Sequence, residues 1–253
     1  MTEYFSNDVS SNAQSQTTNR PYKIISIEGN IGSGKSTLLN NLKEEYKYNP
    51  NVVFLDEPVD SWNNIKDSNG QTMLEKFYGN QEKYSFPFQM MAYISRLSVI
   101  KNAIQKHPGC VFISERCLYT DKHVFAKMLY DTGKIEDVNY QIYNEWFDTF
   151  VDEFVISQII YVKTSPEICY SRVKVRSRDG EDSIPVEYLQ DCHEYHTNMM
   201  NVMMNQRDTD VLVLNGNVNL KTEPHQLKGW MEMIDRVVKK TCEDKDDTVV
   251  TTC

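Results

Sequence analysis

The sequence predicts an α/β fold in which helices cover both faces of one parallel sheet of five strands. Two observations carry this prediction. Short apolar runs alternate along the chain with longer segments of helical periodicity, which is the order of a parallel sheet with crossover helices. A glycine-rich loop also stands between the first strand and the first helix. No internal repeat or linker interrupts the alternation, so the 253 residues are expected to form one domain.

The five apolar runs are predicted to be strands because buried parallel strands are continuously apolar. They are residues 22–27, 51–56, 110–114, 158–162 and 211–214. Apolar residues at helical spacing, and prolines that favour a first helical turn, predict the helices. The first helix follows Lys35, and the next three span 86–105, 119–130 and 138–154. Two more begin at Pro166 and Pro185, and a last helix stops before residue 241. Residues 60–80 should hold a loop and a short helix. The methionine stripe on the helix from Pro185 is interpreted as core rather than as a cofactor site.

Both ends of the chain are expected to be unstructured. Residues 1–20 are rich in Ser, Asn, Gln and Thr and offer little to bury, which predicts a disordered tail. The acidic segment 241–253 is predicted to be a flexible C-terminal tail. The folded domain is therefore expected to span residues 21–240.

Composition limits the partners and the compartment. A net charge of −9 argues against a nucleic-acid or anionic-membrane partner. No apolar run approaches the ~20 residues of a membrane span. The N-terminal segment resembles neither a secretory signal nor an Arg-rich presequence. The six cysteines are scattered without a C-x-x-C pair, which favours reduced thiols. A soluble, cytoplasmic protein is predicted.

The glycine-rich loop has the pattern G-x-x-x-x-G-K-S of a phosphate-binding P-loop. Its residues are Gly29, Asn30, Ile31, Gly32, Ser33, Gly34, Lys35, Ser36 and Thr37. Backbone N–H groups and the following helix N-terminus would hold a phosphate, and Lys35 would add a full positive charge. The Ser36 hydroxyl can bind Mg²⁺. Because strand, loop and helix are in register, a chance glycine turn is disfavoured, and an ATP or GTP phosphate is expected here.

Charged residues also stand at the carboxyl ends of the second and third predicted strands. In open α/β sheets, ligands bind at the carboxyl ends of strands. Glu57 follows the second strand and could be a solvated loop carboxylate, or the partner of a phosphoryl-acceptor hydroxyl. Arg116, at the end of an adjoining strand, favours the second interpretation. Its neighbour Glu115 could hold Mg²⁺ through water.

Three further patterns have two interpretations each. Arg172, Arg176 and Arg178 form either a solvated helix face or a clamp that closes over ATP phosphates, and the clamp is favoured. Gln89 and Arg96 lie on one face of the long helix, and are either a buried hydrogen-bonded pair or a pocket wall that reads a base edge. His193 and His196 lack a third ligand in sequence, so a metal site there is disfavoured.

Several motifs in order resemble the deoxynucleoside kinases of the deoxycytidine and deoxyguanosine kinase type, over about residues 23–238. The motifs are IEGNIGSGKST at 27–37, EPV at 57–59, SFPFQ at 85–89, SR at 95–96, ERCLYTD at 115–121, RVKVRSR at 172–178 and IPVEYL at 184–189. The resemblance implies a P-loop kinase fold and an ATP-dependent deoxynucleoside 5′-kinase of nucleotide salvage. It also implies Mg²⁺ with ATP, a homodimer through 138–154, and feedback by a deoxynucleoside triphosphate.

The resemblance also implies roles for individual residues. Glu57 would be the general base for the sugar 5′-hydroxyl, with Arg116 beside it and Lys35 on the donor phosphates. Arg172, Arg176 and Arg178 would hold those phosphates, and Ser36 and Glu115 would serve Mg²⁺. Tyr78 and Glu181 would bind the 3′-hydroxyl and Gln89 the base. Trp62, Phe88 and Phe125 would be stacking walls, with Phe77 and Ala92 also against the substrate.

Arg96 and Asp121 bear on base choice. Members of the family with this pair favour deoxycytidine, deoxyadenosine and deoxyguanosine over thymidine, and a site with buried polar groups penalises an analogue that leaves them unpaired. Cys117 and Phe77 depart from the family pattern and could retune that choice. There are two alternatives. One is a thymidylate-kinase-like monophosphate kinase, which would need an extra cation to hold the phosphate of its acceptor. The other is a nucleotide-sensing P-loop module, which is disfavoured because the base-specific GTPase motif N-K-x-D is absent from the sequence.

Overall fold

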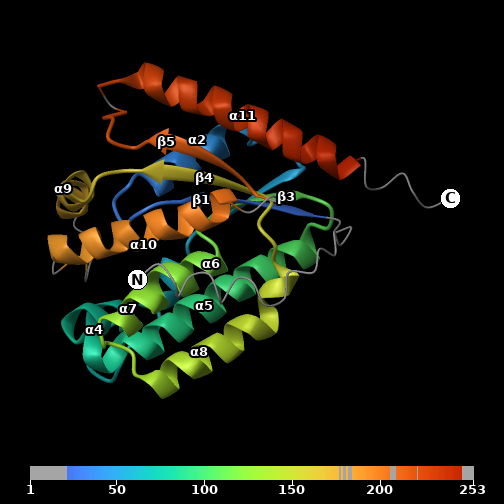
Figure 1. Ribbon diagram of the computed structural model, residues 1–253. Helices are drawn as coiled ribbons and strands as arrows, with labels where there is room; N and C mark the ends of the chain where they lie inside the picture. The colour runs from blue at the N-terminus through green and yellow to red at the C-terminus, as the bar shows by residue number, and fades with distance from the viewer. Residues whose placement is uncertain are drawn as a thin grey trace.

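A computed structural model (Figure 1) describes residues 22–246 except 177, 179, 180, 182, 183, 206–208 and 221. The tail predicted at 1–20 lies outside the described residues, as does most of the charged loop after Arg178. Helix α11 (Pro224–Asp246) continues six residues into the segment 241–253 that was predicted to be flexible. The boundary at 241 is therefore too early, and residues 247–253 are not described.

The five predicted strands form one parallel sheet in the order β2-β3-β1-β4-β5. Each neighbouring pair is parallel. The strands are β1 (Lys23–Glu28), β2 (Val52–Leu55), β3 (Val111–Glu115), β4 (Gln158–Lys163) and β5 (Asp210–Asn215). All carboxyl ends therefore meet at one edge, and the predicted fold class is confirmed.

Helices cover both faces of this sheet (Figure 1). They are α2 (Lys35–Glu45), α3 (Val59–Asn63), α4 (Met73–Gly79), α5 (Gln81–Lys106), α6 (Leu118–Thr120), η1 (Asp121–Ala126), α7 (Lys127–Asp131), α8 (Asp137–Phe150), η2 (Val151–Glu153), α9 (Pro166–Arg176), α10 (Val186–Asn205) and α11. Helices α2 and α11 pack on one face, and α5, α8 and α10 on the other.

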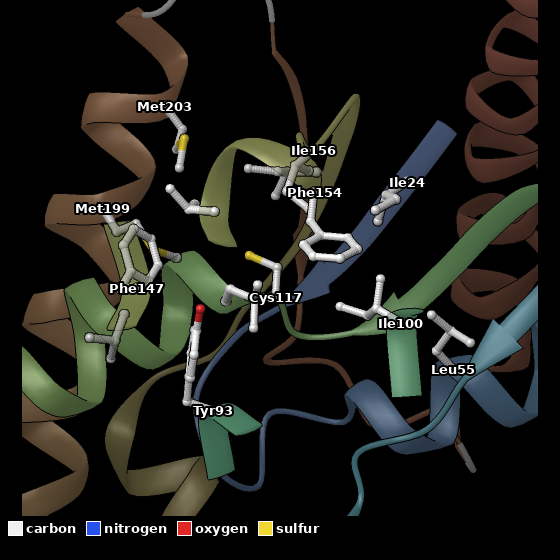
Figure 2. Close-up of a cluster of buried hydrophobic side chains, with 14 of the residues drawn as sticks. Ile24, Leu55, Tyr93, Ile100, Cys117, Phe147, Phe154, Ile156, Met199 and Met203 are labelled. Atoms are coloured by element: carbon white, nitrogen blue, oxygen red, sulfur yellow. The ribbon is translucent and has the colours of Figure 1, made fainter. Parts of the chain in front are cut away.

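Successive side chains of β1 point to opposite faces of the sheet and so enter two separate cores. Ile25 and Ile27 contact the core beneath α2 and α11, whereas Ile24 points into the opposite core. Figure 2 shows that second core, where Ile24 lies near Ile100 of α5 and Met199 of α10 belongs to the same cluster. Met199 and Met203 are buried in it, so the predicted core role of the methionine stripe is confirmed.

Two predicted helices differ in detail from those observed. The helix predicted from residue 86 begins at Gln81, with Asn80 as its cap and Pro87 in its second turn. The segment predicted as one helix over 119–130 contains η1, a π-helix, between two α-helical pieces. A single inserted residue in a helical turn causes this change, and helical periodicity does not reveal it.

The described cysteines Cys110, Cys117, Cys169, Cys192 and Cys242 are free thiols. Among the described helices, none combines the length and apolar character that a membrane span requires.

Gly216 follows β5 at a position where a side chain has no room. A Cβ there would lie 1.9 Å from Thr164 Oγ1 and 2.9 Å from Val162 Cγ1. Gly216→Ala should therefore lower the free energy of unfolding by about 1–3 kcal/mol, as overpacking does. Urea denaturation measures this change.

Gly229 in α11 is the matched control, because a Cβ at that position meets nothing within 4 Å. Gly229→Ala should raise the free energy of unfolding by about 0.5–1 kcal/mol, since glycine weakens a helix interior. Equal effects of the two substitutions would contradict the packing described around Gly216.

Candidate active site

One cavity of about 810 Å³ lies at the carboxyl edge of the sheet. All of the residues predicted for the site line it, except Gly29 and Asn30. The P-loop, the ends of β2 and β3, helices α4 and α5, η1 and helix α9 each contribute side chains. Residues from these seven segments are thus brought to one continuous space.

The P-loop packs closely on α9 and leaves the N-terminus of α2 uncapped by any side chain. Gly32 has a φ of 78°, and a Cβ there would lie 2.5 Å from the carbonyl oxygen of Cys169. Helix α2 begins at Lys35 with Gly34 as its N-cap and with no side-chain cap. Its first N–H groups therefore remain available, which is the arrangement that binds anions at helix N-termini.

Asn30 is part of the loop, but its side chain does not reach the cavity. Its Nδ2 donates to the carbonyl of Leu189 in α10 at 2.7 Å, and its Oδ1 accepts from the N–H of Ile31 at 2.8 Å. The side chain is buried. Asn30 therefore connects the P-loop to α10 through its side chain.

Lys35 is held inside the loop by the backbone. Its Nζ donates to the carbonyl oxygen of Asn30 at 2.8 Å, and only 4% of the residue is exposed. Burial and the nearby charge of Arg116 lower the pKa of Lys35 to about 8. A bound phosphate would counter both effects, so ligand binding and protonation of Lys35 are linked.

Glu57 contacts two arginines. Its Oε1 accepts hydrogen bonds from Nη1 of Arg116 and, at 3.4 Å, from Nη2 of Arg96. Burial alone would raise the pKa of Glu57, but the charges of Arg116, Arg96 and Lys35 lower it to about 2. The carboxylate is therefore ionised at neutral pH and points into the cavity with its cationic partners.

Arg116 has a strained backbone that its neighbours hold in place. Its φ is 64°, which is uncommon for a residue with a Cβ. Its N–H donates to the carbonyl of Ile27 at 3.0 Å, and its carbonyl accepts from Ser114 Oγ at 2.7 Å. Such strain costs about 1–3 kcal/mol and is concentrated at functional sites. The turn aims the guanidinium at Glu57 and over the ring of Phe125, 5.1 Å from its centroid.

Arg96 links three segments through its buried guanidinium. Its Nε donates to Asp121 Oδ2 at 2.8 Å, and its Nη1 donates to the carbonyl of Glu115 at 2.6 Å. Burial raises the pKa of Asp121, while Arg96 acts in the opposite direction. We call Glu57, Arg96, Arg116 and Asp121 the ion cluster. Arg96 therefore pairs with Asp121 and Glu57, and it lines the cavity together with Gln89.

The π-helix η1 places two of these groups. It begins at Asp121 and includes Phe125, and both side chains line the cavity. π-Helical turns recur at functional sites because the extra residue re-aims the side chains around it. Here the turn supplies both a carboxylate for Arg96 and an aromatic wall beside Arg116.

Aromatic rings form the other walls. Phe77 and Phe88 stack with their centroids 4.5 Å apart and their planes 13° apart, and Trp62 meets Phe88 edge-on. The Trp62 indole donates to Ser95 Oγ at 2.8 Å, which fixes its orientation. Ala92 lies among these rings and leaves them space. The resulting surface suits a flat ring.

The three arginines predicted as a clamp have partners within the protein. Arg172 donates to the carbonyls of Ser33 at 3.1 Å and Val218 at 2.8 Å, and so joins the P-loop to the segment after β5. Arg176 and Arg178 both form ion pairs with Glu181. All three line the cavity, so their charges face the space beside the P-loop.

Several lining residues were not predicted from the sequence. Tyr188 of α10 meets Tyr78 edge-on; it lies in the motif IPVEYL at 184–189, but no role was assigned to it from that motif. The segment 216–220 also lines the cavity. The rule that directed attention to the ends of the first three strands applies equally to the end of β5, and would have found this segment.

The two residues predicted for Mg²⁺ lie together, because Ser36 Oγ donates to Glu115 Oε1 at 2.8 Å. Among the described residues, no group of three or more His, Cys, Asp and Glu side chains is placed to hold a metal ion. A cation here would therefore take most of its ligands from phosphate oxygens and water. His196, one of the two histidines for which a metal site was disfavoured, hydrogen-bonds through Nδ1 to the carbonyl of Cys192 at 2.7 Å.

Known proteins resemble this chain over most of its length. The family model described as deoxynucleoside kinase matches residues 25–239. A probable deoxycytidine kinase of fowlpox virus is 39% identical over 178 residues, covering 69% of this chain and 70% of the viral protein. Human deoxycytidine kinase is 34% identical over 197 residues, covering 69% and 74%. A mitochondrial deoxyguanosine kinase of Xenopus laevis is 29% identical over 234 residues, covering 83% and 85%.

The lowered pKa of Lys35 predicts that ATP affinity depends on pH. The free protein loses the Lys35 charge near pH 8, so ATP should bind about tenfold more weakly at pH 9 than at pH 7. Titration calorimetry at the two pH values measures the change. Lys35→Arg is the control, because arginine stays ionised and its affinity should change less than twofold. Equal pH dependence in both proteins would exclude Lys35 as the titrating group.

Proposed function

We propose the following reaction from one premise, that this chain belongs to the deoxynucleoside kinase family. As a kinase of nucleoside salvage, it phosphorylates deoxynucleosides with ATP. The phosphoryl group moves from the γ-position of ATP to the sugar 5′-hydroxyl. One observation carries the proposal: Glu57 and its two arginines line the same cavity as the P-loop.

Glu57 is the general base of this reaction. The 5′-oxygen forms a bond to the γ-phosphorus as its proton passes to Glu57, the bond from phosphorus to the β–γ bridging oxygen breaks, and ADP leaves. A carboxylate with a pKa of about 2 is a weak base. Arg116 therefore shifts part of its hydrogen bonding from Glu57 to the 5′-oxygen when substrate is bound, which raises the basicity of Glu57 as the proton arrives.

The P-loop holds the donor phosphates. Lys35 leaves the Asn30 carbonyl for a phosphate oxygen, and Arg172, Arg176 and Arg178 add positive charge from α9 and the segment after it. Ser36 and Glu115 fit Mg²⁺ as a hydroxyl and a carboxylate beside the phosphates. When bound, Mg²⁺ would neutralise charge on the phosphate oxygens.

The base of the acceptor lies between the aromatic walls. Gln89 makes two hydrogen bonds to the base edge, and Tyr78 and Glu181 bind the 3′-hydroxyl. Asp121 uses one oxygen on Arg96 and presents the other to an exocyclic amino group. Deoxycytidine, deoxyadenosine and deoxyguanosine are therefore preferred over thymidine, whose carbonyl in that place would face the carboxylate. The family match disfavours a monophosphate kinase. Such an enzyme would need an extra cation for the phosphate of its acceptor, whereas both arginines of the ion cluster already contact Glu57.

The protein acts as a homodimer through α5 and α8. Ile94 of α5 and Ile142 and Trp146 of α8 are 46%, 42% and 45% exposed, and Trp146 stacks on Phe150. Exposed apolar side chains on two helices that contact each other favour a covered interface. A deoxynucleoside triphosphate acts as a feedback inhibitor by filling both halves of the continuous cavity. Free thiols at five cysteines support a reducing, cytoplasmic location.

Glu57→Gln should lower kcat by about 10²–10⁴-fold, because glutamine cannot accept the hydroxyl proton. Steady-state phosphorylation of deoxycytidine measures kcat, and titration calorimetry should show ATP affinity within threefold of wild type. Asp56→Asn is the matched control: this neighbouring carboxylate is exposed, pairs with Lys43 and does not line the cavity. Its kcat should change less than twofold. Unchanged turnover in Glu57→Gln would eliminate the general-base assignment.

Trp146→Lys should shift the protein from dimer to monomer at micromolar concentration, because a charge replaces an apolar contact in the proposed interface. Sedimentation velocity measures the molecular mass. Tyr48→Lys is the control, since Tyr48 is 88% exposed and follows α2, which packs on the other face of the sheet from α5 and α8. A wild-type protein that sediments as a monomer would contradict the dimer.

A further inference from the structure

Ser114 is a buried serine of β3 to which the proposed reaction gives no role. Only 2% of the residue is exposed, and it does not line the cavity. Its Oγ donates a hydrogen bond at 2.7 Å to the carbonyl oxygen of Arg116, two residues further along the chain. Because Ser114 lies outside the cavity, an effect of its hydroxyl on the reaction must pass through Arg116.

The turn that Ser114 contacts is strained and is held by three hydrogen bonds. Arg116 has a φ of 64°, in the left-handed region that residues with a Cβ seldom adopt. Its N–H donates to the carbonyl of Ile27 at 3.0 Å, and the carbonyl of Glu115 accepts from Arg96 Nη1 at 2.6 Å. The third bond is the one from Ser114. It alone of the three comes from a side chain outside the cavity, so a substitution can remove it without changing the cavity wall.

The guanidinium of Arg116 depends on this turn for its direction. Its Nη1 donates to Glu57, and the group lies over the ring of Phe125, 5.1 Å from the centroid. Its Nε is buried and has no hydrogen-bond partner in the part of the chain that the structure describes. A ring face attracts a cation but does not pair with individual N–H groups. The backbone and Glu57 therefore share the task of aiming the guanidinium.

The proposed reaction changes one of these two constraints. When Glu57 accepts the proton of the acceptor hydroxyl, it ceases to be an anion. A neutral carboxyl group accepts a weaker hydrogen bond than a carboxylate does. Glu57 thus loosens its hold on Arg116 at the step in which Arg116 must face the 5′-oxygen. The bond from Ser114 to the Arg116 carbonyl does not involve Glu57, so proton transfer leaves it intact.

We propose that Ser114 is a positioning residue whose hydroxyl fixes the turn at Arg116, and so keeps the guanidinium on the acceptor oxygen while Glu57 is protonated. The inference rests on the proposed roles of Glu57 and Arg116. Its chemical requirement is a hydroxyl donor at position 114, which threonine retains and alanine lacks. Preorganisation of this kind acts on turnover more than on ATP binding.

The test compares Ser114→Ala and Ser114→Thr with wild type, with turnover of deoxycytidine expressed per site that binds ATP. Ser114→Ala should lower kcat about tenfold, because a small displacement of a positioned group has effects of this size or larger. Its KM for ATP should change less than twofold. Ser114→Thr should have a kcat at least threefold above that of Ser114→Ala. Thermal denaturation measures separately the cost of packing the extra methyl group.

Ser26→Ala is the matched control. Ser26 of β1 lies opposite Ser114 in the register of the two strands and is fully buried. Its Oγ donates to Glu28 Oε1 at 2.5 Å and not to the turn at Arg116. The substitution therefore removes a hydroxyl of equal burial from the same level of the sheet. Its kcat should stay within twofold of wild type, whatever its Tm.

Three results would overturn the proposal. The first is an unchanged kcat in Ser114→Ala, because the hydroxyl would then have a purely structural role. The second is a kcat of Ser114→Thr no higher than that of Ser114→Ala, and the third is an equal loss in Ser26→Ala, since both would indicate packing rather than the hydrogen bond to Arg116. Glu57→Gln, measured alongside, separates the two proposals. An inactive Glu57→Gln with a fully active Ser114→Ala overturns only the role of Ser114, whereas a fully active Glu57→Gln overturns both.

Discussion

The structure of the site depends on two arginines buried beside carboxylates. Arg96 and Arg116 are only 2% and 4% exposed, and both contact Glu57. Removing one member of such a buried pair leaves an uncompensated charge, at a cost of about 3–5 kcal/mol. The positions of the groups in the ion cluster are therefore mutually dependent. Each segment that supplies one of these groups must aim its side chain at the cluster.

Three of these segments meet this requirement by different means. Helix α5 supplies Arg96 from a regular helix face, and η1 supplies Asp121 through a π-helical turn. The end of β3 supplies Arg116 through a strained φ, which Ser114 and the carbonyl of Ile27 stabilise. Where regular geometry does not aim a side chain at the cluster, the chain thus adopts an irregular one. The same network orients Glu57, the proposed catalytic carboxylate, and forms one wall of the proposed base site.

Much of the fold and part of the site could be predicted from the sequence. Apolar runs identified all five strands, because strands buried on both faces leave a continuous pattern. The P-loop and the ends of β2 and β3 were located by motif and by the strand-end rule. The π-helix was not predictable, because one extra residue in a turn leaves helical spacing nearly intact. The side chains of Asn30 and Arg172 also bind the carbonyls of Leu189 and Val218, which are tertiary contacts that no local pattern encodes.

The central claim is that Asp121 joins base recognition to the orientation of Glu57 through Arg96. The most direct measurement is steady-state phosphorylation of all four deoxynucleosides, side by side, by wild type and by Asp121→Asn. The account predicts that wild type prefers the three amino-bearing bases over thymidine by at least about tenfold in kcat/KM. Asp121→Asn should both reduce that preference and lower kcat for deoxycytidine, since Arg96 loses its charged partner. A reduced preference with unchanged kcat for deoxycytidine, or equal use of thymidine by wild type, would contradict it.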